Sequence, residues 1–442
     1  MKKRVISLLI ALCLTLWFVP FSLADEALTD GPLIVAPDVP SPWAQTELYI
    51  AGVYGIPELS GWTKPVDADE FAALIEAVGG TPSSIAVPTR GDTVAELAKV
   101  IAAELKVKVD DPAAYFVTNK LIYGRTLPDG KTDLALSEPI TAQEAVILAK
   151  RAYEHIRYAL GEDSKALLWK VSDEDNTVYL LGSVHIVTPD AYPLSKAVMA
   201  AWAESEILVE ELDLTDIEAI ANALLDAIYY SDGGTLSDDV SAETYTALVE
   251  FLEAFGLPGD SYDEIKPWYV AQDLQSGIFA QLIASGELTS GADQFFTDIR
   301  GNRPIIALET AEFQYGMLSG IGKEYDEYNI LTSLAAYTDE DDYAEFVGSL
   351  YDMIAAWHAG DEGALQKSLA ETDEDHAALL ADYRDKLSTK RNGPMTEKIT
   401  KFLTDDKVND YFVVVGALHM IDEGNGIVKQ LTEAGYTVER IK

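Results

Sequence analysis

Cysteine, histidine and basic side chains are scarce in this chain of 442 residues. One cysteine, Cys13, excludes both a disulfide framework and a metal centre built from thiolates. Lysine and arginine number 32 against 74 aspartates and glutamates, which gives a formal net charge of −42. Nucleic acid and anionic membrane would be repelled, so neither is expected as the main partner. Hydrophobic residues make up 48% of the chain, which is ample for packed cores and excludes wholesale disorder.

The first 24 residues have the pattern of a secretory signal. A basic start, MKKR, precedes the apolar run VISLLIALCLTLWFV, and small residues end at Ala24 before two acids. This order is typical of a cleaved signal peptide (1–24). A retained membrane anchor is the alternative, because the run is close to the shortest length that spans a bilayer. We expect cleavage after Ala24, which would leave a secreted or cell-surface protein with no cysteine and no stable membrane span.

Residues 41–156 are expected to form a small all-α domain. Proline, a capping residue and apolar positions at helical spacing recur in PVDADEFAALIEAV, VPTRGDTVAELAKVIAAEL and SEPITAQEAVILAKRAYEHI. The repetition indicates an internal repeat, and an ordinary small helical domain is the alternative. The region resembles S-layer homology modules, which tether exported proteins to cell-wall polymers. That resemblance implies a cell-wall polymer as a candidate partner, and among the three motif starts only Arg90 keeps the basic residue that would contact it.

Residues 166–442 have a different pattern, in which strands alternate with helices. LLWKV and TVYLLG flank the turn SDEDN and predict a hairpin. RPIIALE is a short apolar strand, and DYFVVVG is apolar enough to be buried on both faces. The chain ends with a helix, GIVKQLTEA, and a strand, YTVERI. This order predicts an α/β (mixed α+β) domain.

Two of the five histidines stand in matching surroundings. His185 follows LLGSV and His419 follows VVGAL, so each comes after an apolar strand, a glycine and two further residues. Sites in open α/β sheets gather at the carboxyl ends of strands, where glycine permits a sharp turn or a close approach. We expect two such strand ends side by side to bring both imidazoles to one site. Two hydrogen-bonded core histidines are the alternative.

Carboxylates are available to join these histidines. The predicted strand ILVEELDL, residues 207–214, carries the adjacent acids Glu210 and Glu211, which strand alternation places on opposite faces. Acids in an apolar strand are costly unless they are paired or bound to a metal. Glu309 follows the apolar PIIAL in the same way, although a salt bridge or a helix cap would also explain it. Two imidazoles with one or two carboxylates suit Zn, Mn, Co or Fe, which would acidify a bound water.

The pair Arg391-Asn392 is predicted to follow a helix, within LSTKRNGPM. An exposed pair of this kind is usually solvated. Folded over the site, the guanidinium could instead hold a carboxylate or a developing oxyanion.

Residues 167–441 resemble the TraB/GumN/PrgY family, which includes the Tiki proteins. The resemblance is carried, in the family's order, by YLLGSVHIV, VEELDL, GADQFF, ALETAEFQ, the RN pair and VVVGALHMIDEGNG. It implies a mixed α/β core with paired glycine-x-x-histidine motifs and, through the Tiki members, a metal-dependent protease. The family's functional positions fall here on His185, Glu211, Glu309, Arg391, Asn392 and His419.

Three functions remain open on this reading. The leading hypothesis is an exported metal-dependent hydrolase, in particular a peptidase, acting on a peptide or small molecule. The expected ligands of a divalent cation (Mn, Co or Zn) are His185, Glu211 and His419. The expected general base is Glu210 or Glu309, and the substrate would be held by Arg391 and Asn392. The second hypothesis is a metal-free, esterase-like hydrolase with His185 as base and Glu211 orienting it. The third is a surface protein that binds a peptide or signal without cleaving it.

Overall fold

The structure, a computed structural model, describes residues 38–130, 132–173, 175–370, 373–404 and 408–442. The predicted signal peptide lies outside these ranges. The chain divides into two compact units with the boundary between Asp163 and Ser164, and each unit is described by itself. Within the described ranges, no helix combines the length and the apolar character needed to cross a membrane.

The first unit is mainly helical. Its elements are α2 (Gln45–Val53), α3 (Ala68–Ala77), α4 (Arg90–Leu105), α5 (Pro112–Thr118), β1 (Arg125–Thr126), β2 (Thr132–Asp133) and α6 (Ala142–Leu160). The three repeated segments form α3, α4 and α6, and each helix begins with a capping box. The loops before these helices are joined by backbone hydrogen bonds, from Val66 to Ile140 and from Ile140 to Pro88. The repeat therefore brings three helix starts together.

Arg90, the basic residue kept at one of these helix starts, is bonded within the first unit. Its Nη1 lies 2.8 Å from Oε1 of Glu144, in the first turn of α6. The guanidinium thus links two of the repeated helices. Polymer binding by this unit stays a prediction.

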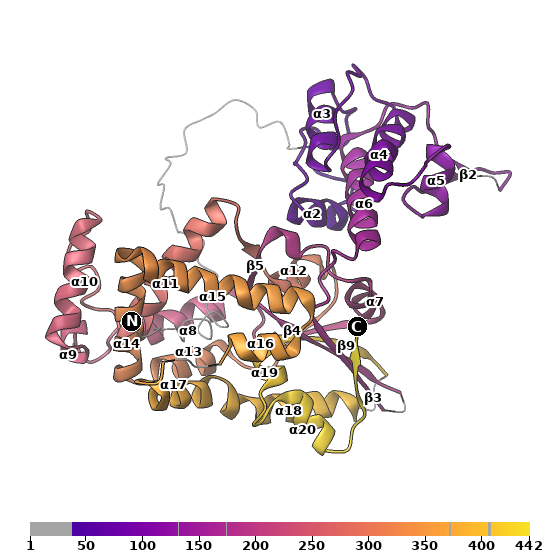
Figure 1. Cartoon of the computed structure of the whole chain (residues 1–442). Helices are drawn as coiled ribbons and strands as arrows, with labels where there is room; N and C mark the ends of the chain where they lie inside the picture. The colour runs from indigo at the N-terminus through magenta and orange to yellow at the C-terminus, as the bar shows by residue number, and fades with distance from the viewer. Residues whose placement is uncertain (1–37, 131, 174, 371–372, 405–407) are drawn as a thin grey trace. The chain divides into compact units, whose positions relative to one another are not determined.

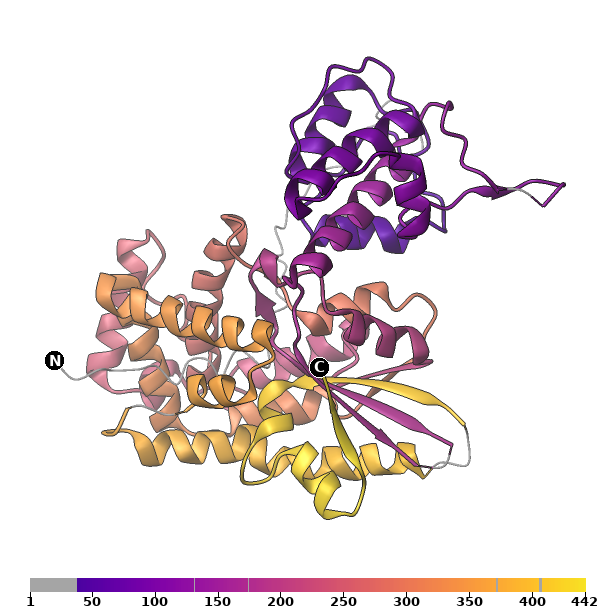
Figure 2. The same cartoon turned by 45° about the vertical axis from the view of Figure 1, so that its right-hand side comes forward.

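The second unit is built on a six-stranded mixed sheet in the order β10-β3-β4-β9-β6-β8. Its strands are β3 (Leu167–Ser172), β4 (Thr177–Ser183), β6 (Ile207–Glu210), β8 (Ile305–Ala307), β9 (Asp410–Gly416) and β10 (Val438–Ile441). β3 and β4 form the predicted antiparallel hairpin, while β4, β9, β6 and β8 run parallel. Figure 2 shows these strands fanned out above the C-terminal helices, which are yellow in that view. The predicted α/β architecture is confirmed for this unit.

Helices and one small ribbon complete the second unit. They are β5 (Ile186–Val187), η1 (Pro189–Ala191), α7 (Lys196–Glu204), α8 (Ile217–Ile228), α9 (Leu236–Asp239), α10 (Ala242–Ala254), α11 (Pro267–Ala284), β7 (Thr289–Ser290), α12 (Ala292–Ile299), α13 (Ala311–Ser319), α14 (Lys323–Thr338), α15 (Glu340–Ala359), α16 (Glu362–Ser368), α17 (Ala377–Arg384), η2 (Asp385–Thr389), α18 (Lys390–Leu403), α19 (Ala417–Ile421) and α20 (Ile427–Glu433). Figure 1 shows α9, α10, α11 and α14 gathered to one side of the sheet.

Neighbouring residues of β9 pack on opposite faces of the sheet. Phe412 lies against Trp202 of α7 and Phe296 of α12, with ring centroids 5.4 and 4.6 Å away. Tyr411 stacks on Phe402 of α18 at 4.6 Å. Because side chains alternate along a strand, helices cover both faces of β9. The continuous apolar run DYFVVVG is buried as predicted.

The carboxyl ends of the parallel strands meet at one edge of the sheet. Ser183 at the end of β4 pairs with Gly416 at the end of β9, and Glu210 at the end of β6 pairs with Ala307 of β8. The strands that precede the two glycine-x-x-histidine histidines are therefore neighbours. The predicted strand at 207–214 is shorter than expected, because β6 ends at Glu210.

The packing of β9 generates a stability prediction. Phe412 is fully buried among aromatic rings, so Phe412→Ala should leave a cavity and cost about 3–5 kcal/mol of unfolding free energy. Phe255→Ala, at a ring that is 60% exposed, is the matched control and should cost about 1 kcal/mol or less. Urea denaturation of both variants measures the difference. Equal losses would contradict the placement of Phe412 at the centre of the core.

Candidate functional site

The segments after β4 and β9 bring His185 and His419 into one cluster. His419 lies in α19, is 2% exposed, and has its Nε2 3.9 Å from Oε2 of Glu211. A positive charge on either imidazole would lower the pKa of Glu211, so His185 belongs to the same electrostatic environment. Gly182 permits this approach, because a Cβ there would lie 3.1 Å from Cα of Ala417. The first glycine of the motif thus lets the two strand ends pack closely.

Glu211 is the first residue after β6 and is held by groups from two other segments. Its Oε1 accepts a hydrogen bond from the backbone N–H of Gly416, at 2.8 Å. Its Oε2 accepts one from Nη2 of Arg391, at 2.7 Å. Both oxygens are therefore engaged, one by the end of β9 and one by a guanidinium.

Arg391 is 1% exposed and uses all of its nitrogens inside the protein. Its Nε and Nη2 donate to Glu309 at 2.9 and 2.5 Å, and its Nη1 donates to the carbonyl of Leu387 at 2.9 Å. Gln314 of α13 donates to Glu309 as well, at 2.9 Å. The sequence allowed Arg391 to be solvated or to hold a substrate. The structure instead places it between Glu211 and Glu309, where it holds both carboxylates.

The helix predicted before Arg391 is present. The pair Arg391-Asn392 follows α17 and the π-helical segment η2, and it lies itself in the first turn of α18. Pro394 is in the same turn and lacks the N–H that a regular helix would use there. Irregular π segments are frequent at functional sites. Here the π segment directly precedes the buried pair Arg391 and Asn392.

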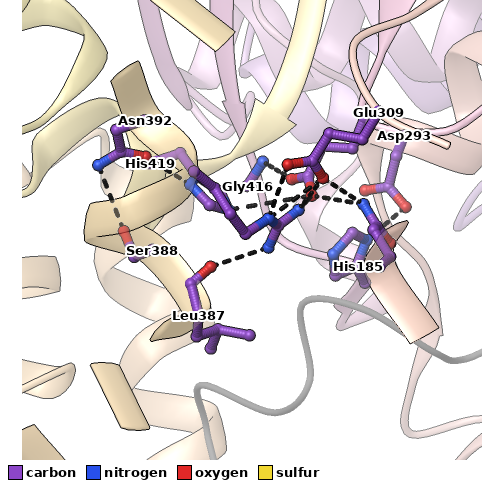
Figure 3. A network of polar contacts seen from close by, with 11 residues as sticks. His185, Asp293, Glu309, Leu387, Ser388, Asn392, Gly416 and His419 are labelled. Carbon is purple, nitrogen blue, oxygen red and sulfur yellow. Dashed lines mark hydrogen bonds and ion pairs between the residues drawn. The ribbon is translucent and has the colours of Figure 1, made fainter. Parts of the chain in front are cut away.

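Each histidine of the pair is anchored through its Nδ1. Nδ1 of His419 lies 2.6 Å from Oδ1 of Asn392, and Nδ1 of His185 lies 2.6 Å from Oδ2 of Asp293. An amide oxygen and a carboxylate oxygen both accept hydrogen bonds, so each Nδ1 donates, and in a neutral ring the lone pair would then be on Nε2. Figure 3 shows the two histidines on opposite sides of the carboxylates, each beside its own partner.

Glu210 points to the other side of its strand end, as alternation predicts. Its Oε1 accepts a hydrogen bond from Thr297 of α12 at 2.6 Å, and it is 2% exposed. Burial, reinforced by the charge of Asp293, raises the pKa of Glu210 to about 8, although the bond from Thr297 acts in the opposite sense. Glu210 is therefore protonated at neutral pH, which disfavours it as a general base.

The buried charges bias the protonation of the cluster. Burial, followed by the charge of Arg391, lowers the pKa of His419 to about 4. Burial alone would raise the pKa of Glu211, but nearby positive groups and the Gly416 N–H hold it at about 2. Since His419 is neutral at neutral pH, Arg391 is the lasting source of that low value. Around Arg391 itself, one guanidinium faces the two carboxylates of Glu211 and Glu309, which leaves one negative charge in excess among these three groups.

Sequence reasoning missed Asp293 and Gln314. Asp293 stands in GADQFF, in the first turn of α12, where an acid is ordinary because it complements the helix dipole. Gln314 lies within α13, and its sequence neighbours give no sign of a buried partner. The other histidines are bonded elsewhere, to Tyr115 (His155), Ser164 (His358) and Asp373 (His376).

The fit of a metal ion to this cluster depends on Glu211. In the ranges that the structure describes, no group of three or more histidine, cysteine, aspartate or glutamate side chains is arranged to hold a metal ion. The two imidazoles suit a ligand role, because metal-binding histidines usually donate their other N–H to an oxygen. Glu211 could also be a ligand, through the carboxylate lone pairs that its hydrogen bonds from Arg391 and Gly416 do not use. A divalent cation held by His185, Glu211 and His419 therefore stays a proposal, in which Glu211 would be shared with Arg391.

Removal of the buried guanidinium should strongly lower the stability of the fold. In Arg391→Met, Glu211 and Glu309 would face each other without their cation, so we expect a loss of about 3–5 kcal/mol of unfolding free energy. Arg125→Met is the matched control, because Arg125 is exposed and paired with Glu138 at the surface, and it should unfold as the wild type does. Chemical denaturation measures both. A loss in Arg391→Met no larger than in the control would contradict this account of the cluster.

Stability should also depend on the protonation of His419. An unfolded chain binds a proton on this residue below pH 6.5, whereas the folded protein does so only below about 4. Lowering the pH through this window therefore favours unfolding, by on the order of 3 kcal/mol for this group alone. His419→Gln should lose less stability between pH 6.5 and 4 than the wild type does. Parallel pH profiles for the two proteins would contradict the prediction.

Comparison with known proteins assigns the second unit to a family. A family model described as the TraB/PrgY/gumN family matches residues 167–440, a range that contains every residue of the cluster. No curated protein and no solved structure gives a significant match. The helical unit lies outside the matched range, and its resemblance to S-layer modules stays a prediction. Because the match spans more than half of the sequence, the chain belongs to the TraB/PrgY/gumN family.

Proposed function

We propose that the protein is an exported hydrolase, in particular a peptidase, that activates water at the cluster around His185, Glu211 and His419. We propose further that these three side chains bind a divalent cation (Mn, Co or Zn). The observation that carries the proposal is the anchoring of both imidazoles through Nδ1, beside a buried carboxylate. In this proposal the two imidazoles, from neighbouring strand ends, would bind the ion through their Nε2 atoms.

The charge balance supports a cation at this place. Glu211 and Glu309 share Arg391, so one negative charge remains in excess in a buried setting. Buried charge is costly unless it is paired, and a bound cation would complete the pairing. The neutral state of His419 supports the same role, because a ligand imidazole must be deprotonated.

The remaining residues of the cluster have supporting roles in this proposal. When bound, the ion would supply acidified water and polarise a carbonyl group. Arg391 holds the two carboxylates in place, and Asn392 sets the direction of the His419 ring. Glu309 is the better candidate for accepting a proton from water, because Glu210 is protonated and faces Thr297. In this proposal Arg391 and Asn392 act on the cluster and not on the substrate.

A metal-free hydrolase is the second candidate, and one contact favours it. Asp293 lies 2.6 Å from Nδ1 of His185, which is the arrangement of an oriented general base. Arg391 and Gly416 at the same time engage both oxygens of Glu211. In this version His185 takes the proton of water and Asp293, not Glu211 as the sequence suggested, orients the ring.

Metal analysis of purified protein tests the leading proposal. We expect about one ion per chain in the wild type and almost none in the His185→Ala/His419→Ala double variant, because two of three ligands are lost. His376→Ala is the control, since His376 is half exposed and bonded to Asp373 outside the cluster. Equal, sub-stoichiometric metal in the wild type and the double variant would contradict the proposed ion site.

Peptide incubation separates the candidate functions. New peptide termini that disappear after strong chelation and return with Mn, Co or Zn support the metal-dependent hydrolase. Cleavage unaffected by chelation supports the metal-free version with His185 as base. Peptide binding without new termini contradicts both and supports a protein that sequesters its ligand.

A further inference from the structure

We infer that Asp293 is a positioning residue that fixes the tautomer and direction of the His185 ring. The inference deepens the proposed function and rests on it only in assigning His185 to the chemistry. Asp293 and His185 are more than a hundred residues apart in the sequence. Three features bring them together: a two-stranded antiparallel pairing, a glycine that no other residue could replace, and a helix packed firmly on the sheet.

The two-stranded pairing joins the segments that follow His185 and precede Asp293. β5 pairs antiparallel with β7, with Ile186 opposite Ser290 and Val187 opposite Thr289. The N–H of Gly291 donates to the carbonyl of His185 itself, at 2.7 Å. The main chain on which the imidazole stands is therefore tied to the start of α12.

Glycine is the one residue type at position 291 that allows this contact. A Cβ at position 291 would lie 1.7 Å from the carbonyl oxygen of Val184 and 2.6 Å from the carbonyl carbon of His185. Such distances are far inside van der Waals contact, so any side chain would push the two segments apart. The glycine of GADQFF thus sets the distance between Asp293 and His185.

The helix that carries Asp293 is fixed by its packing. Phe296 of α12 lies against Trp202 and Phe412 on the sheet, with ring centroids 5.0 and 4.6 Å away. Thr297, one turn after Asp293, donates to Glu210 of β6 at 2.6 Å. Asp293 therefore reaches His185 from a rigid element, and the 2.6 Å bond between them does not depend on a mobile loop.

The bonding of Asp293 argues against a purely structural role. The residue is 8% exposed, and its Oδ1 has no hydrogen-bond partner among the described residues. It does not cap α12, whose N-cap is Gly291 without a side-chain bond. A buried carboxylate is costly to keep. In the described structure, the one side-chain hydrogen bond of Asp293 that offsets this cost is the bond to His185.

The result is a ring with a defined tautomer. Because a carboxylate oxygen accepts, Nδ1 of His185 carries a proton, and in the neutral ring Nε2 then carries the lone pair. Asn392 does the same for His419 with an amide oxygen, from the other side of the carboxylates. Without Asp293, the ring of His185 could rotate or exchange tautomers, and its Nε2 would no longer be presented in one direction.

Nitrogen-15 NMR of histidine-labelled protein tests the inference without relying on activity. The wild type should show His185 as the Nδ1–H tautomer, with its signal assigned through the His185→Gln variant. Asp293→Ala should give a mixture with the Nε2–H form, whereas Asp293→Asn, which keeps an acceptor oxygen, should retain the wild-type tautomer. Asp298→Ala, on the exposed side of α12, is the control and should change nothing. The signal of His419 should be the same in the wild type, Asp293→Ala, Asp293→Asn and Asp298→Ala.

Two results would overturn the inference. One is a wild-type His185 in the Nε2–H form, which decides the matter even if Asp293→Ala does not fold. The other is an unchanged His185 signal in a folded Asp293→Ala variant. Where hydrolysis is detected, Asp293→Ala should lower kcat about 10–100-fold with little change in KM, and Asp293→Asn should recover most of it. A shifted tautomer in a protein without hydrolase activity would contradict the proposed function and leave the positioning role intact.

Discussion

The ion pairs of Arg391 hold the candidate site together. Its guanidinium is buried and bonds to Glu211 from the end of β6, to Glu309 after β8 and to a carbonyl of η2. A buried arginine without these partners would be too costly to keep, and the two carboxylates without it would repel each other. The three charges therefore depend on one another, and they fix how the helix α18 sits against two strand ends.

The position of Asn392 follows from that constraint. Once Arg391 is inserted between the carboxylates, the next residue of α18 is directed to the segment after β9, where its Oδ1 meets Nδ1 of His419. The close packing at Gly182 places the end of β4 beside the same segment. The site is thus assembled by the sheet edge and by one helix that carries a cation inward, and Asp293 completes it from α12.

The sequence predicted those parts of this arrangement that depend on local pattern. Apolar strands such as β9, the two glycine-x-x-histidine motifs and the opposite directions of Glu210 and Glu211 all follow from spacing and alternation. The burial of Arg391 could not be predicted in this way, because its partners are 82 and 180 residues away. The role of Asp293 could not be predicted from the sequence for a different reason. An acid in the first turn of a helix is common, and only its partner shows that it belongs to the site.

The two histidine anchors differ in a way that bears on mechanism. Asp293 is a carboxylate and Asn392 a neutral amide, although each accepts from Nδ1 at 2.6 Å. A carboxylate stabilises a positive charge on its imidazole more than an amide does, and Arg391 opposes such a charge on His419. The two motif histidines are therefore similar in sequence but not in electrostatic setting. If the two rings hold a cation, His185 would be the more electron-rich ligand, and in a metal-free reaction His185 would be the ring that receives the proton.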